Sequence, residues 1–218
     1  MRSSFLKYGA SLALACAAAA TPLFAQVNTG VGANATTHQD ANWTVTFGPL
    51  GYGGTATGTN EPTFVVQSPP SPPWIPDTPN SMWISTNTSA TLANGTGDNA
   101  ERYSYAWTQM FTATSTSPIQ MTVWTDNYFH KFTFNGVDYV VPPAQVAPSP
   151  GDFANGARVY TLNPVTNTNN TLTLFTTGDG QTDAINVAFS SVPEPSSIAL
   201  LGTGLIGLVP MIRRKRKV

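Results

Sequence analysis

The middle of the chain is a series of short hydrophobic runs separated by turn residues. The runs are rich in Thr, Val, Tyr, Phe and Trp, whereas Gly, Pro, Asn and Asp stand between them. β-Branched and aromatic residues favour strands, and no long stretch has apolar residues at the i, i+3, i+4 and i+7 spacing of an amphipathic helix. The pattern predicts strands over residues 43–47, 63–67, 82–85, 103–112, 119–124, 131–134, 139–141, 158–162, 171–175 and 184–189.

Several of these runs alternate between apolar and polar positions, which is the period of a strand with one buried face. In the fifth run, Ile119, Met121 and Val123 fall on one face. Asn135-Gly136, between two runs, is a favoured dipeptide for a tight β-hairpin turn. Many short strands with turns between them predict an all-β fold, an antiparallel β-sandwich or jelly roll.

The first 25 residues have the features of a secretory signal peptide. Arg2 and Lys7 supply positive charge, and the apolar run that follows is shorter than the 20 or so residues of a membrane-spanning helix. Small residues permit cleavage after Ala20 or after Ala25, and the helix-breaking Pro22 favours the second site. We therefore expect export through the Sec translocon and cleavage by signal peptidase; an uncleaved anchor is the alternative.

Cys16 is the only cysteine of the chain, and it lies inside this signal. The mature protein is therefore expected to have no disulfide, no thiolate metal ligand and no thiol nucleophile.

The C-terminal 27 residues contain three different features in a fixed order. Pro193, Glu194 and Pro195 come first, and prolines hold such a segment extended because they fix φ and remove backbone donors. An apolar stretch over residues 197–212 follows, about 24 Å long as a helix, and predicts a transmembrane helix. The last feature is a cluster of basic side chains that keeps its end of the helix in the cytoplasm. Its members are Arg213, Arg214, Lys215, Arg216 and Lys217.

This order resembles the PEP-CTERM sorting domain, which is found in Gram-negative bacteria that make extracellular polysaccharide. The resemblance implies that Pro193, Glu194 and Pro195 form the sorting motif and that the basic cluster is a stop-transfer signal. It also implies an inner-membrane intermediate, processing by an exosortase, and a final place at the cell surface or in the extracellular matrix. An ordinary tail anchor with a chance Pro-Glu-Pro is the alternative.

The chain is thus expected to comprise a signal peptide (1–25), a β-sandwich passenger (26–191) and a sorting signal (192–218). The passenger carries ten acidic residues against three basic ones, a formal net charge near −7. Nucleic acid is excluded as a partner, because phosphate binding needs basic surface.

Residues 68–80 form a proline-rich segment that cannot be a central strand, and we expect an ordered loop anchored by Trp74 and Ile75. A set of aromatic and turn residues recurs along the passenger: Trp124, Asp126-Asn127, Asn135-Gly136, Asn42 to Val45, Pro73-Trp74 and Ser81 to Ile84. Through these residues the passenger resembles galactose-binding-like jelly rolls.

Catalytic signals are weak in the passenger. Its histidines, His38 and His130, stand without the partners of a triad or a zinc site, and a surface or strand-edge role explains His130. Asp126, Asp138 and Asp152 are candidates for the paired carboxylates of a glycosidase, but loop solvation and Asx turns explain them more simply. We therefore expect a protein that is not an enzyme.

The passenger contains two candidate binding sites. Asp179 and Asp183 have the spacing of calcium ligands without the full EF-hand pattern, so we expect either structural calcium or a tight hairpin turn between the runs 171–175 and 184–189. Among the five tryptophans, Trp74 is the best candidate for an exposed platform that stacks on sugar rings.

The features together predict an exported, noncatalytic surface or extracellular-matrix protein that is associated with exopolysaccharide. The first alternative is a carbohydrate-binding module that recognises extracellular glycan, and the second is a secreted hydrolase.

Overall fold

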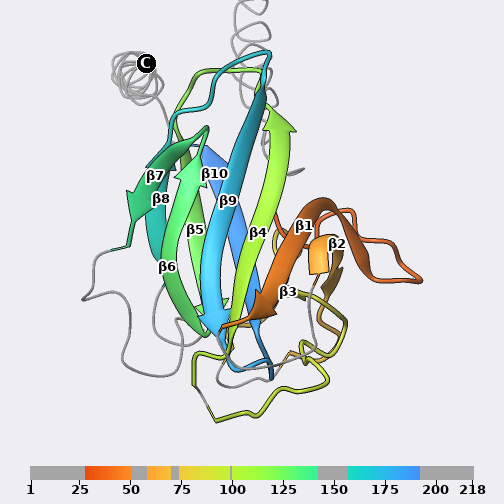
Figure 1. Cartoon of the computed structure of the whole chain (residues 1–218). Coiled ribbons are helices and arrows are strands. Elements are labelled where there is room, and N and C mark those ends of the chain that lie inside the picture. The colour runs from red at the N-terminus through yellow and green to blue at the C-terminus, as the bar shows by residue number, and fades with distance from the viewer. Residues whose placement is uncertain (1–27, 51–57, 70–73, 99, 142–156, 192–218) are drawn as a thin grey trace, which may run out of the picture.

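The computed structural model describes residues 28–50, 58–69, 74–98, 100–141 and 157–191, which form ten strands (Figure 1). The strands are β1 (Gln39–Pro49), β2 (Gly58–Val65), β3 (Ile84–Ser85), β4 (Tyr103–Thr112), β5 (Ile119–Asp126), β6 (Tyr128–Phe134), β7 (Val137–Val140), β8 (Arg158–Leu162), β9 (Asn169–Gly178) and β10 (Ala184–Ser191). Each predicted run overlaps one of these strands, and the predicted bounds of β4 and β8 agree with the structure.

The strands form one antiparallel sheet in the order β7-β6-β9-β4-β1-β2-β3-β10-β5-β8. The sheet curls into a half-barrel, so that β6 and β9 at one side face β5 and β10 at the other (Figure 1). Tyr160 of β8 closes the curl, because its ring lies 6.1 Å from that of Phe129 and 4.8 Å from that of Phe132 in β6. The all-β antiparallel class is confirmed, and the observed form is a continuous curled sheet rather than two separate layers.

The main hydrophobic core lies inside the curl. The inner face of β5 contributes Ile119, Met121 and Val123, which are buried as their alternation predicts. Trp107 of β4 and Leu174 of β9 are fully buried from the opposite side. Large apolar side chains each stabilise a fold by about 1.5–3 kcal/mol when fully buried, so this core holds the passenger together without a disulfide.

A second, smaller core lies outside the curl, under the proline-rich segment. Its buried members are Val66, Trp74, Trp83, Ala90 and Ala184, and the rings of Trp74 and Trp83 are 4.2 Å apart. Ile75 packs against this cluster, so the predicted anchoring of the segment is confirmed. β10 is consequently buried on both faces at its start, with Ala184 on the outside and Ile185 on the inside.

The hairpin predicted at Asn135-Gly136 is confirmed. Asn135 has a φ of 50° and Gly136 a φ of 79°, and Phe134 pairs with Val137 across the turn. This is the geometry of a tight hairpin turn with positive φ at both central residues.

The hairpin expected between the last two strands as the alternative to calcium is wrong. β9 pairs with β4 and β6, whereas β10 pairs with β3 and β5. The chain therefore crosses from one half of the curled sheet to the other between Gly178 and Ala184.

Within the described ranges, no helix is long and apolar enough to span a membrane. The predicted signal peptide, with its cleavage sites, and the predicted transmembrane helix lie outside these ranges.

Candidate functional site

Three buried aspartates meet at one end of the curled sheet. Asp126 ends β5, Asp179 follows β9 and Asp183 precedes β10, and each is at most 5% exposed. The register brings them together, because Ala184 pairs with Asp126 at the start of β10. The sequence singled out Asp179 and Asp183 as a pair, and Asp126 separately as a glycosidase candidate; the structure joins all three in what we call the aspartate cluster.

Asp183 is the centre of this cluster. Its carboxylate accepts hydrogen bonds from the Tyr105 hydroxyl at 2.5 Å, the Gly180 backbone N–H at 2.7 Å and the Asn127 side-chain amide at 3.3 Å. Burial raises the pKa of Asp183 well above its usual value, against the hydrogen bonds, and the charges of Asp179 and Asp126 raise it further. Burial, followed by the charge of Asp183, also raises the pKa of Tyr105, so this hydroxyl stays a donor.

Asp126 accepts a hydrogen bond from the indole N–H of Trp74 at 2.8 Å. Burial raises the pKa of Asp126 to about 7; the bond from Trp74 opposes this shift, and the charge of Asp179 adds to it. The expectation that Trp74 is exposed is wrong, because its side chain is only 3% exposed and packs on Trp83. Trp74 therefore presents no open ring face to a sugar.

Two glycine-containing loops pack against each other beside the cluster. The Thr96 N–H bonds to the Asp179 carbonyl at 3.2 Å, and the Arg102 N–H bonds to the Gly178 carbonyl at 2.7 Å. A Cβ on Gly95 would lie 2.3 Å from the carbonyl oxygen of Gly180, so only glycine permits this approach.

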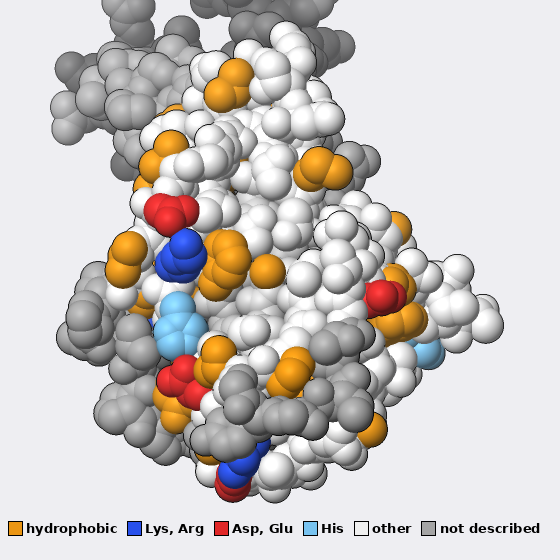
Figure 2. All heavy atoms as spheres, in the orientation of Figure 1, with side chains coloured by type: hydrophobic (Ala, Val, Ile, Leu, Met, Phe, Trp, Pro, Cys, Tyr) orange, Lys and Arg blue, Asp and Glu red, His pale blue; other side chains and the backbone are white. Residues whose placement is uncertain are grey.

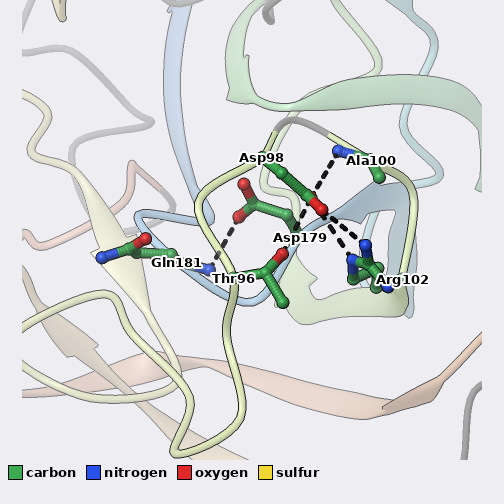
Figure 3. Close-up of polar contacts among 6 residues, drawn as sticks. All are labelled: Thr96, Asp98, Ala100, Arg102, Asp179 and Gln181. Atoms are coloured by element: carbon green, nitrogen blue, oxygen red, sulfur yellow. Dashed lines mark hydrogen bonds and ion pairs between the residues drawn. The ribbon is translucent and has the colours of Figure 1, made fainter.

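Asp98 fixes the first of these loops at the surface. It accepts bonds from the Thr96 hydroxyl at 2.8 Å, the Ala100 N–H at 3.1 Å and the Arg102 guanidinium at 2.5 Å (Figure 3). The bond from Arg102 lowers the pKa of Asp98, whereas burial raises the pKa of Asp126.

In the part of the chain that the structure describes, no group of three or more His, Cys, Asp or Glu side chains is arranged to hold a metal ion. Asp183 is occupied by protein donors, and Asp179 accepts the Gln181 N–H at 2.8 Å. Calcium at Asp179 and Asp183 stays a prediction without support from this geometry.

The other catalytic candidates lie apart. Asp138 sits on β7, where it pairs with Lys131 at 3.0 Å, and Asp152 is outside the described residues. The ring of His130 bonds to the Thr177 hydroxyl at 2.7 Å and lies 3.5 Å from Glu101 on a half-exposed surface, as a strand histidine would.

The segment that matches a known sorting signal begins at the last residue of β10. β10 runs to Ser191, and the chain matches the PEP-CTERM protein-sorting motif over residues 191–217. This motif implies an exported protein that is sorted to the cell surface in Gram-negative bacteria. The motif implies processing by an exosortase. Pro193, Glu194, Pro195 and the basic cluster lie outside the described residues.

Comparison with curated proteins found no match. Among solved structures, the chain is similar to a β-glucosidase from Kluyveromyces marxianus in complex with glucose, with a TM-score of 0.41 and 8% identity over 82% of this chain and 19% of the enzyme. It is also similar to the GH31 α-xylosidase from Xanthomonas citri, with a TM-score of 0.32 and 14% identity over 47% of this chain and 10% of the enzyme. The chain thus spans a fifth or less of these enzymes. These likenesses do not confirm a galactose-binding-like fold.

Proposed function

We propose that the protein is a noncatalytic component of the bacterial surface or extracellular matrix. It is exported by Sec, held in the inner membrane by its C-terminal segment, processed by an exosortase, and then retained near exopolysaccharide. The observation that carries this proposal is the PEP-CTERM motif that starts at the last residue of β10.

The position of β10 supports processing downstream of the fold. β10 lies between β3 and β5, so removing it would separate β5 and β8 from the rest of the sheet. Pro193 is the second residue after this strand. An enzyme that acts at Pro193, Glu194 and Pro195 can therefore release a passenger with a complete sheet.

The aspartate cluster supports a structural role rather than hydrolysis. Asp183 and Asp126 are buried, and the fold itself uses them as hydrogen-bond acceptors for Tyr105 and Trp74. A general acid or base must instead reach a substrate proton.

The test of sorting replaces Pro193, Glu194 and Pro195 together by alanine in the native host. The apolar stretch is unchanged, so we expect insertion to continue while full-length protein accumulates in the inner membrane. The matched control replaces Ser196 and Ser197 by alanine and should be processed normally. Normal processing of the motif variant would contradict the proposal.

Retention near exopolysaccharide has a separate test. In a host strain unable to make exopolysaccharide, processed protein should move from the cell-associated fraction into the medium. An unchanged distribution between the two fractions would contradict this part of the proposal.

A further inference from the structure

Seven of the twelve Asp, Glu, Lys and Arg side chains of the described residues lie at one end of the sheet. β4 starts there, β5 and β9 end there, and β10 starts there. The acidic members are Asp77, Asp98, Glu101, Asp126, Asp179 and Asp183, with Arg102 as their basic neighbour. We call this the acidic end.

At the opposite end, the connections that the structure describes carry no charged side chain. The loops over residues 113–118 and 163–168 and the turn at Asn135-Gly136 consist mainly of Ser, Thr and Asn. Figure 2 shows the contrast, with charged side chains on the lower and outer parts of the face and none in its upper part. Asp138, the nearest acid to this turn, is paired with Lys131.

Apolar side chains are exposed at this uncharged end. Val137 is 56% exposed beside the turn, Val165 is 52% exposed in the second loop, and Met110 is 68% exposed near the end of β4. The backbone N–H of Val165 and the side-chain amide of Asn135 both bond to the Asn170 side chain, which ties this turn and loop into one surface.

The chain leaves the fold toward the membrane at the same end. Ser191 pairs with Ile119, and Ile119 pairs with Leu162, the residue before the second loop. Only residues 192–196 separate Ser191 from the apolar stretch that begins at residue 197. Five extended residues reach at most about 18 Å, so the uncharged end cannot lie far from the bilayer.

We propose that the uncharged end rests on the lipid headgroup surface of the inner membrane in the membrane-inserted precursor, with the acidic end directed away. This inference rests on the membrane insertion described under Proposed function. The partner is the phospholipid surface, whose headgroups accept hydrogen bonds from hydroxyl and amide side chains and whose interface accommodates Val137 and Val165.

Charge decides the orientation. The passenger has a net charge near −7, and anionic phospholipids repel it. β5, with eight residues, is about 27 Å long, whereas the Debye length is about 8 Å at physiological ionic strength. Standing on the uncharged end therefore places the exposed carboxylates of the acidic end, Asp98 and Glu101, beyond the reach of the lipid charge. The reverse orientation would bring them against it.

The test uses the full chain with Cys16→Ser, isolated from a host without exosortase and inserted into vesicles of phosphatidylethanolamine and phosphatidylglycerol. A fluorophore is attached at Val165→Cys or, as the matched control, at Ala93→Cys, an exposed residue of the acidic end. Lipids with a quencher on the headgroup should cause a strong loss of fluorescence at position 165 and none at position 93.

A second variant tests the electrostatic argument. Asn167 is exposed and has a φ of 57°, a conformation that aspartate also tolerates. Asn167→Asp should reduce the loss of fluorescence at position 165 in vesicles that contain phosphatidylglycerol, and leave it unchanged in uncharged vesicles.

The outcomes separate this inference from the proposed function. Failure of the chain to float with the vesicles would contradict membrane insertion itself. Flotation with equal quenching at positions 93 and 165 would overturn the orientation alone. Quenching at position 165 that appears only after an exosortase is added would also overturn it, because the surface would then belong to the enzyme.

Discussion

Asp126 should make the passenger more stable in mild acid than at alkaline pH. Burial raises its pKa from 3.8 to about 7, so the folded state binds the proton more tightly than the unfolded state. The stabilisation is complete below pH 3.8 and is lost as the pH rises to 7. The shift of about three pKa units corresponds to about 4 kcal/mol, of which about 2.5 kcal/mol is lost between pH 5 and pH 8.

The assay is urea unfolding of residues 26–191 at pH 5 and pH 8. Asp126→Asn keeps the shape of the side chain and an acceptor for Trp74 but cannot ionise, so the loss of stability between the two pH values should shrink by about 2.5 kcal/mol. Other aspartates with raised pKa, such as Asp183 and Asp40, also make both proteins less stable at pH 8 than at pH 5. Some pH dependence of stability therefore remains in Asp126→Asn.

Asp98→Asn is the matched control, because Arg102 lowers the pKa of this exposed carboxyl and its titration lies below pH 5. The control should leave the difference between pH 5 and pH 8 unchanged. An equal pH dependence in Asp126→Asn and the parent protein would show that Asp126 does not have a raised pKa in the folded state.

Two further predictions concern packing, and both are measured by urea unfolding. Trp74→Ala should lower the free energy of unfolding by about 3–5 kcal/mol, because the side chain is buried. Val159→Ala, at a 55% exposed side chain, should change it by no more than about 0.5 kcal/mol. Unchanged stability in Trp74→Ala would show that Trp74 is not part of a core. Gly180→Ala should lower the free energy of unfolding by about 1–3 kcal/mol more than Gly136→Ala does. Both glycines have positive φ, but only the Cβ at position 180 would meet Tyr103, at 2.4 Å. Equal losses of stability would contradict the close packing of the loops.

The strands were predictable because their signal is local. Alternation of apolar and polar residues marks a half-buried strand wherever it lies in the sheet, and Ile119, Met121 and Val123 illustrate this. The turn at Asn135-Gly136 was predictable for the same reason, since positive φ at both positions depends on the two residues themselves.

The pairing of strands was not predictable, because it depends on contacts between distant parts of the chain. The short connection between β9 and β10 suggested a hairpin, yet the two strands lie in opposite halves of the sheet. The burial of Trp74 was missed for a similar reason. A proline-rich segment usually lies at the surface, and the hydrogen-bond partner of Trp74, Asp126, is 52 residues away.

The sequence predicted only part of the aspartate cluster. Asp179 and Asp183 are neighbours in the chain and suggested a shared site. Asp126 joins them through the pairing of β5 with β10, which no local pattern encodes. The burial of β10 on both faces was likewise not predictable, because its outer face is covered by the distant proline-rich segment.

If the C-terminal segment is a processing signal and not a permanent anchor, the mature protein must lose it. Mass spectrometry of the mature protein, recovered from the cell surface of the native host, measures this loss. We predict that the chain retains Ser191, so that β10 is complete, and lacks the basic cluster from Arg213 to Lys217. Mature surface protein with an intact C-terminus through Val218 would show that the segment is a permanent anchor instead.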